Sequence, residues 1–275
     1  LRKSKIFKRR IIIAGLIIIA LFVLIAIFGP MFTPYGFREM DIVNRLSPPS
    51  GEHFFGTDKV GRDIFSRAIM GARYTMLVGM SVMITSIIFG SLIGMIAGFV
   101  RKIDNVVMRI LDGMMAFPPI LLAIAMMAAL GASVTNVIIA LSIVYMPRIA
   151  RIVRAQVLSA RELVYVEAAT ALGIRPRRIV FRHILPNIIS PVVVQGTFVF
   201  AYAVLNEAAL SFLGVGVPPM IPTWGNMLSE GRDIYQIAWW YMLFPGSFIV
   251  LVVFAINMVG DGLRDIFDPL TFSNK

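Results

Sequence analysis

Few side chains of this 275-residue sequence could take part in covalent chemistry. The chain contains no G-x-x-x-x-G-K-[ST] phosphate loop, no H-E-x-x-H metal motif and no G-x-S-x-G nucleophile motif. It has no cysteine, and its two histidines, His53 and His183, stand far apart in the sequence and are expected on opposite sides of a membrane. We therefore expect no catalytic residue, no cofactor and no metal ion on this chain.

The residues with the most informative spacing lie in one polar stretch, EAATALGIRPRRIVFRHILPN, in which Glu167 precedes the small residues Ala168 and Ala169. Good helix formers lead to Gly173, a common left-handed helix stop, and Pro176 suits the first turn of a second helix. Small residues allow another surface to approach a helix closely, so this bent helical pair favours insertion into a groove on a partner. A basic loop that only sets membrane orientation is the alternative.

The second of these short helices is predicted to have two faces. Arg177, Arg178 and Arg182 lie on its polar side, and Ile179 lies on its apolar side. Pro186 is expected to end the unit before the next membrane span begins. The pair of helices would then project from the membrane as one polar element.

The rest of the chain has the composition of a membrane protein. Hydrophobic residues make up 58% of it and the mean hydropathy is +0.84, above the values of a soluble domain. Because a helix needs roughly 20 apolar residues to cross the hydrocarbon core, the long apolar runs predict an all-α integral membrane protein. The six predicted transmembrane helices are 11–29, 76–100, 114–131, 134–150, 188–211 and 237–258.

Proline and glycine suggest how some spans bend and pack. Pro118 and Pro119 lie one turn into the third span and favour a bend, either static or a hinge. Gly90, Gly94 and Gly98 recur every four residues in the second span and form a face that another helix can approach closely. The third and fourth spans share the short LGASVTN connection, which predicts a helical hairpin.

Basic residues predict the orientation. With six spans both termini lie on one side, and that side carries 19 of the 26 Lys and Arg residues. The positive-inside rule places the termini and the loops 101–113 and 151–187 in the cytoplasm. The net charge of +11 is then explained by topology and lipid headgroups, so no nucleic-acid partner is expected. The first apolar run is interpreted as an uncleaved anchor, and residues are expected to precede Leu1 because it is not Met.

Ionisable residues within the predicted spans are scarce. Arg148 is predicted at the cytoplasmic end of the fourth span, and Glu207 lies about one turn from the outer end of the fifth. A transporter coupled to protons or sodium would need several such groups, so an external energy source is favoured. Gln195, Asn206 and Glu207 are the predicted polar residues of a weakly adhesive translocation path, with a paired interfacial carboxylate as the alternative for Glu207.

The two predicted external segments, 30–74 and 214–236, mix aromatic, apolar and charged residues. We expect them to form a mouth that receives an external partner, with Asp58, Trp224 and Met227 among the contact residues. An interfacial aromatic belt is the alternative explanation for Trp224.

Several of these stretches resemble one family. EAATALG followed by FRHILPN resembles the EAA loop of ABC importer permeases, although His183 stands where that family commonly has isoleucine. The departure is typical of the dipeptide, oligopeptide and nickel branch, and so are FGTDKVGRDIFSRAIMGAR, LSFLGVGVPPMIPTWGNML and NMVGDGLRDIFDP. The resemblance covers nearly the whole chain and is strongest to the second permease subunit of a peptide importer.

The resemblance implies a type I ABC importer permease fold with a cytoplasmic coupling helix, in a bacterial or archaeal cytoplasmic membrane. It implies a homologous second permease chain, two ABC ATPase subunits and an extracytoplasmic substrate-binding protein, besides membrane lipid. Residues 1–75 would form the basic N-terminus, the first span and an external segment, and residues 76–275 the permease core. The implied ATPase-docking residues are Glu167, Ala168, Ala169, Gly173, Arg177 and Arg178.

The implied cargo is a dipeptide or an oligopeptide. Nickel complexes, glutathione or another small solute are alternatives within the same type of importer. A self-sufficient secondary transporter is the alternative from a different class, and the apolar spans and the lack of an inverted repeat disfavour it.

Overall fold

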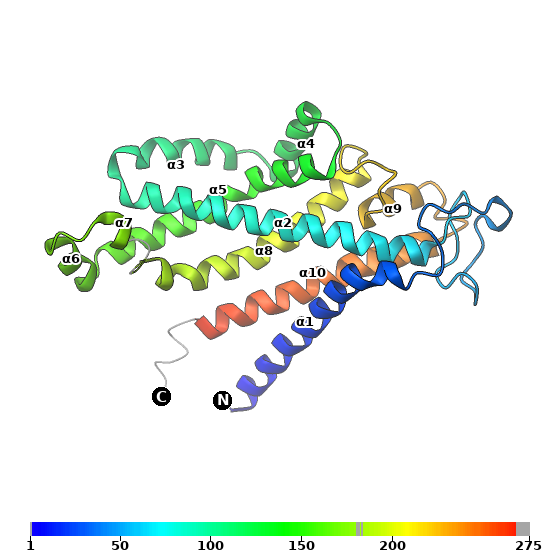
Figure 1. Ribbon diagram of the computed structural model, residues 1–275, viewed down its shortest axis with the longest axis horizontal. Coiled ribbons are helices and arrows are strands. Elements are labelled where there is room, and N and C mark those ends of the chain that lie inside the picture. The colour runs from blue at the N-terminus through cyan, green and yellow to red at the C-terminus, as the bar shows by residue number, and fades with distance from the viewer. Residues whose placement is uncertain (1, 180–181, 183, 268–275) are drawn as a thin grey trace.

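The computed structural model describes residues 2–179, 182 and 184–267, and this part of the chain is helical, with no named strand (Figure 1). Most long helices run along one axis of the molecule. The short helices α6 (Val164–Ala171) and α7 (Pro176–Ile179) lie at one end, which we call the α6 end. Helix α9 (Trp224–Gly231) lies towards the other, the α9 end, with the segment that joins α1 to α2.

Five helices are long and apolar enough to cross a membrane. A shorter pair, α3 and α4, is bent by 93° and makes a sixth span when its two parts are counted together. The described chain is thus an all-α membrane protein with five spans, or six with the bent pair. The five long helices are α1 (Arg2–Phe28), α2 (Ile64–Phe99), α5 (Val134–Arg161), α8 (Leu185–Phe212) and α10 (Trp240–Phe267).

The sequence predicted residues 114–131 as one continuous helix, and this prediction is wrong. Its place is taken by the end of α3 (Arg101–Met115) and by α4 (Pro119–Leu130), separated by a break at Pro118. Proline has no N–H to continue the helical ladder, and it disfavours helical backbone in the residue before it. The predicted bend is therefore a full break. The predicted hairpin of the third and fourth spans is confirmed in its second half, because α4 contacts α5.

Residues 101–113 form most of α3, although the sequence predicted a loop there. Hydropathy misses this helix because its charged and apolar residues alternate at helical spacing. Two of its carboxylates pair with arginines of α5: Asp104 with Arg154, and Asp112 with Arg151, each at 2.5 Å. Both carboxylates of α3 are thus paired with arginines of α5.

The predicted glycine face of α2 is confirmed, and it packs against α5. A Cβ at Gly90 would lie 2.7 Å from the Cβ of Ile149, and a Cβ at Gly94 would collide with the carbonyl oxygen of Ala150. Gly98 meets the next turn of α5 in the same way. The missing side chains let the two backbones approach closely enough to form the centre of the bundle.

All five long helices are longer than the spans predicted for them, and the extensions of α2 and α5 bear on the site. Helix α2 begins at Ile64 rather than residue 76, because the side chain of Asp63 caps it by accepting a hydrogen bond from the Ser66 amide at 2.7 Å. Helix α5 continues to Arg161 rather than residue 150. Arg148 therefore lies in the middle of a helix and not at its end.

Candidate functional site

The chain between α5 and α8 forms the two short helices that the sequence predicted. Helix α6 ends at Ala171, Gly173 has a left-handed backbone with a φ of +73°, and α7 begins at Pro176. The predicted sharp turn at Gly173 is therefore confirmed. Pro186 was expected to end this unit, but it lies in the first turn of α8, which begins at Leu185.

Helix α6 and Leu172, the residue that follows it, present apolar side chains on the outer surface. Val164 is 80% exposed and Leu172 is 81% exposed. The exposed Ala168 lies midway between them, and spacing of four residues places all three on one stripe. Glu167 is exposed beside this stripe, whereas Ala169 is buried in the core. The stripe is an apolar surface that this chain leaves uncovered.

Internal contacts attach this element to the bundle. Ile179 is buried in the same apolar core as α2 and α5. The Tyr165 hydroxyl accepts a hydrogen bond from Asn187 Nδ2 at 3.0 Å, which ties α6 to the start of α8. At the end of α5, Arg161 Nη1 donates to the Gly98 carbonyl oxygen at 2.9 Å and so caps α2. These contacts join α6 to the start of α8, and the end of α5 to the end of α2.

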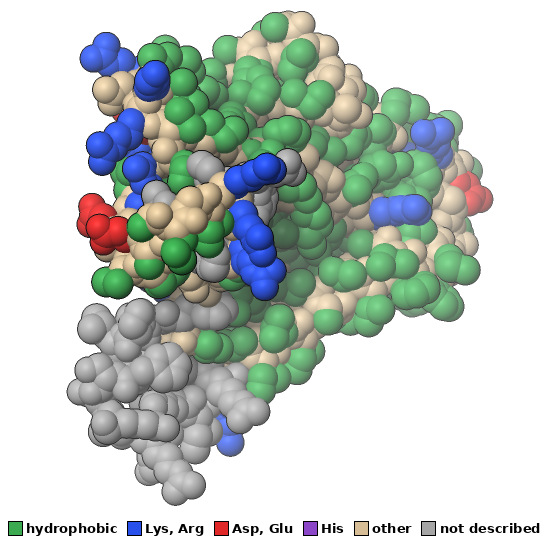
Figure 2. Space-filling view, turned by 60° about the vertical axis from the view of Figure 1, so that its left-hand side comes forward, with side chains coloured by type: hydrophobic (Ala, Val, Ile, Leu, Met, Phe, Trp, Pro, Cys, Tyr) green, Lys and Arg blue, Asp and Glu red, His purple; other side chains and the backbone are tan. Residues whose placement is uncertain are grey.

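The α6 end is also strongly basic. Figure 2 brings this end forward and shows Lys and Arg side chains gathered over it, with a smaller group of Asp and Glu. Arg178, one of the predicted docking residues, is exposed. The side chain of Arg177, the other predicted arginine, lies outside the described part of the chain. Charge and exposed apolar surface thus occur together at this end.

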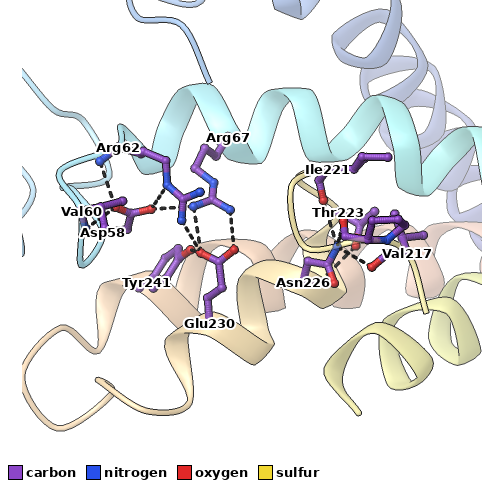
Figure 3. A network of polar contacts seen from close by, with 11 residues as sticks. Asp58, Val60, Arg62, Arg67, Val217, Ile221, Thr223, Asn226, Glu230 and Tyr241 are labelled. Carbon is purple, nitrogen blue, oxygen red and sulfur yellow. Dashed lines mark hydrogen bonds and ion pairs between the residues drawn. The ribbon is translucent and has the colours of Figure 1, made fainter. Parts of the chain in front are cut away.

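The α9 end contains a buried network of charged side chains (Figure 3). Asp58 accepts hydrogen bonds from Arg67 at 2.5 Å and from Arg62 at 2.6 Å. Glu230 binds both arginines, through Nη atoms of Arg62 at 2.7 Å and of Arg67 at 2.9 Å. The Tyr241 hydroxyl donates to Glu230 at 2.6 Å. The network joins the segment before α2 to α9 and α10.

The charges of this network stabilise one another. Burial alone would raise the pKa of Glu230, but the hydrogen bonds and the positive charge of Arg67 hold that pKa below its usual range. Ionised groups removed from water are tolerated only when they are paired and hydrogen-bonded. The network therefore depends on all of its members being present.

The three residues predicted to contact an external partner belong to this interior. Asp58, Trp224 and Met227 have no exposed surface. The Trp224 indole N–H donates to the Ala68 carbonyl oxygen at 2.9 Å, so the ring lies against α2. Buried side chains cannot reach another protein, and the prediction is wrong for these three. Their charged and aromatic side chains contact other parts of this chain and stabilise its fold.

The predicted path residues separate into two groups. Gln195 and Asn206 are both partly exposed on α8, and their separation of three helical turns places them on one face. Glu207 faces another way: it is fully buried and accepts a hydrogen bond from Ser211 at 2.8 Å, with Thr75 at 3.5 Å. Glu207 is thus hydrogen-bonded to hydroxyl groups inside the chain and has no surface on the face that Gln195 and Asn206 share.

One cavity lies near the α9 end, with a volume of about 300 Å³. Its lining includes His53 and Asp63, whose Nδ1 and Oδ1 atoms are 2.9 Å apart. This cavity was not predicted from the sequence. Among the described residues, no group of three His, Asp or Glu side chains is placed to hold a metal ion.

Two family models match this sequence. Residues 86–273 match the model described as binding-protein-dependent transport system inner membrane component. Residues 4–49 match the N-terminal transmembrane domain of oligopeptide transport permease C. The chain belongs to the binding-protein-dependent family of inner membrane permeases. Such a permease functions with a substrate-binding protein and with an ATPase.

Relatives and a solved structure agree with this family. The permease is 50% identical over 263 residues to a dipeptide transport system permease protein of Alkalihalophilus pseudofirmus, covering 95% of this chain and 86% of the relative. It is 40% identical to an oligopeptide transport system permease protein of Bacillus subtilis, over 94% of this chain and 86% of that protein. Its fold is similar to a chain of the inward-facing MetNI methionine ABC transporter, with a TM-score of 0.61, 20% identity and coverage of 73% and 96%.

Proposed function

We propose that this permease is one of two homologous permease subunits of an ATP-driven importer that moves dipeptides or oligopeptides into the cytoplasm. The names of relatives that are 50% and 40% identical support the peptide cargo. The surplus of basic residues supports a cytoplasmic position for the α6 end and both termini, in a bacterial or archaeal cytoplasmic membrane. An extracytoplasmic binding protein would deliver the peptide at the α9 end.

The observation that carries the coupling role is the exposed stripe Val164, Ala168 and Leu172 on α6. A helix that leaves an apolar stripe uncovered is suited to a groove on a partner protein. We assign that groove to an ATPase subunit, with ATP bound and hydrolysed on the separate ATPase chains. The contacts of Tyr165 and Arg161 would pass its movement to α8 and α2. The two permeases would then alternate between inward- and outward-open states as rigid bodies.

Replacement of Gly173 tests this proposal. A β-branched residue is strongly disfavoured at a φ of +73°, so Gly173→Val should distort the turn between α6 and α7. The added Cβ has no atom within 4 Å, so the bundle itself should remain intact. We expect loss of peptide uptake and of permease-stimulated ATP hydrolysis in liposomes that contain the whole complex.

Gly173→Asn is the matched control, because asparagine accepts left-handed backbone and should retain most of the activity. Normal ATPase stimulation by Gly173→Val would refute the coupling role. Peptide uptake by this chain alone, without ATP, would show instead that it is a secondary transporter.

A further inference from the structure

Arg148 is an arginine midway along the membrane-spanning helix α5. The next residue, Ile149, packs where Gly90 of α2 leaves room for it. Gly90 lies about 15 Å from Val100, at 1.5 Å per residue, in an apolar stretch of α2 that has no charged residue from Tyr74 onwards. This is close to the middle of a hydrocarbon core about 30 Å thick. A charge at that depth is costly and marks a functional position.

Two tyrosine rings hold the guanidinium group. Its central carbon lies 5.2 Å from the ring centroid of Tyr202 on α8 and 5.7 Å from that of Tyr145 on α5. The two rings are stacked, with centroids 6.0 Å apart and planes 13° apart. Asn206 Nδ2 donates to the Tyr145 hydroxyl at 2.7 Å and fixes that ring. Cation–π attraction thus offsets part of the cost of burying Arg148.

Arg148 has no carboxylate within ion-pair distance in the described part of the chain. Arg154, six residues further along α5, pairs with Asp104. Arg148 is partly exposed, and Tyr202 is 42% exposed, so the cation lies at an open surface of the bundle. Its guanidinium donors remain available for a ligand.

This open surface coincides with the predicted path. Tyr202 follows Gln195 by seven residues and precedes Asn206 by four, so the three share one face of α8. Arg148 of α5 lies against the middle of that face, through its contact with Tyr202. The sequence suggested a weakly adhesive path, and it placed Arg148 at the cytoplasmic end of the fourth span.

We propose that Arg148 binds the carboxylate of a peptide at the middle of the membrane, with Tyr145 and Tyr202 holding the guanidinium group in place. A carboxylate that leaves water for an apolar passage is strongly destabilised unless a cation pairs with it. The planar guanidinium group matches a carboxylate with two parallel hydrogen bonds. This inference rests on the proposed import of peptides, and it adds a charge-selective position to the path.

The test uses the reconstituted complex with ATP and its binding protein. Two peptides of the same sequence, without acidic side chains, differ only in a C-terminal carboxylate or amide. Each uptake rate is divided by the wild-type rate for the same peptide, which cancels the preference of the binding protein. For Arg148→Gln we expect uptake of the carboxylate peptide to fall at least about tenfold, as for loss of a charged hydrogen bond. Uptake of the amide should fall less than about twofold.

Two further variants control for folding. Arg151→Gln removes an exposed arginine of the same helix and should affect both peptides equally. Arg148→Lys keeps the charge but loses the planar group, so we expect a smaller loss that is still selective for the carboxylate. It also provides the test if Arg148→Gln does not assemble.

Equal losses for the two peptides, or no loss for the carboxylate peptide, would refute the proposed site. A wild-type complex without ATP-driven uptake of either peptide would refute the proposed function, and this inference with it.

Discussion

The two ends of this permease differ in which side chains they bury and which they expose. At the α9 end, charged residues such as Arg67 and Asp58 are buried and paired within the chain. At the α6 end, apolar residues such as Val164 and Leu172 are exposed. The charged network of the first end is paired within the chain, whereas the apolar stripe of the second is left for another protein to cover.

Because of this difference, the two ends should respond differently to substitution, one in the stability of the chain and the other in its coupling to a partner. Removing one member of a buried ion network leaves the other charges without a partner, so the folded chain becomes less stable. Removing an exposed apolar side chain costs the isolated chain little, because that surface is already in water, and the cost falls on partner binding. We therefore expect substitutions at the α9 end to change stability, and substitutions on the α6 stripe to change docking.

The largest effect is expected for Arg67→Gln. It leaves Asp58 and Glu230 with only Arg62 as a cationic partner, and the loss of stability should be about 3–5 kcal/mol. The measurement is the free energy of unfolding of the purified chain in mixed micelles. Arg232→Gln, which removes the exposed partner of Asp233, is the control and should change stability little. If both variants are equally stable, the network is not what holds the α9 end together.

The next effect is expected for Leu172→Ser on the α6 stripe. Loss of one buried leucine from a docked interface should weaken ATPase binding by about 2 kcal/mol, or roughly thirtyfold in affinity. The unfolding free energy of the isolated permease should remain unchanged. Met220→Ser removes exposed apolar surface near the α9 end and should not alter ATPase binding. If the Leu172→Ser variant unfolds more easily but still binds the ATPase normally, the stripe serves the stability of the chain and not docking.

A smaller effect is expected from acid. Because the pKa of Glu230 is lowered in the folded chain, the unfolded chain takes up this proton more readily. The stabilisation is present above the unfolded pKa of about 4.3 and is lost as the pH falls through the lower, folded value. Unfolding free energies of wild type and Glu230→Gln, measured from pH 7 to 3, should converge in acid. A constant difference between them would show that this carboxylate does not titrate on unfolding.

The smallest effect is expected for Gln195→Ala on the path. A single partly exposed side chain contributes about 0.5 kcal/mol or less, so uptake rates should change about twofold, equally for peptides of different charge. A charge-dependent defect would assign to Gln195 the selectivity that we propose for Arg148.

Local signals in the sequence were enough for the existence of the five long helices and for the turn at Gly173, because hydropathy and backbone preference act over a few residues. They failed at α3, whose charged residues are satisfied by arginines of α5 that only the folded chain brings near. They also failed at Asp58, because its role depends on Arg67 and Glu230, which approach it through the fold. The depth of Arg148 became evident only from the register between α5 and α2.

The length of α2 gives the two ends a mechanical relation. Unlike α5, α8 and α10, this 36-residue helix has no interior proline, and it spans about 54 Å. Arg67 secures its first turns in the ion network, and Arg161 binds its last carbonyls beside the docking helix. If α2 tilted about the ion network, its far end would move furthest. A tilt of only about 5° would move its far end by about 5 Å, the rise of one helical turn.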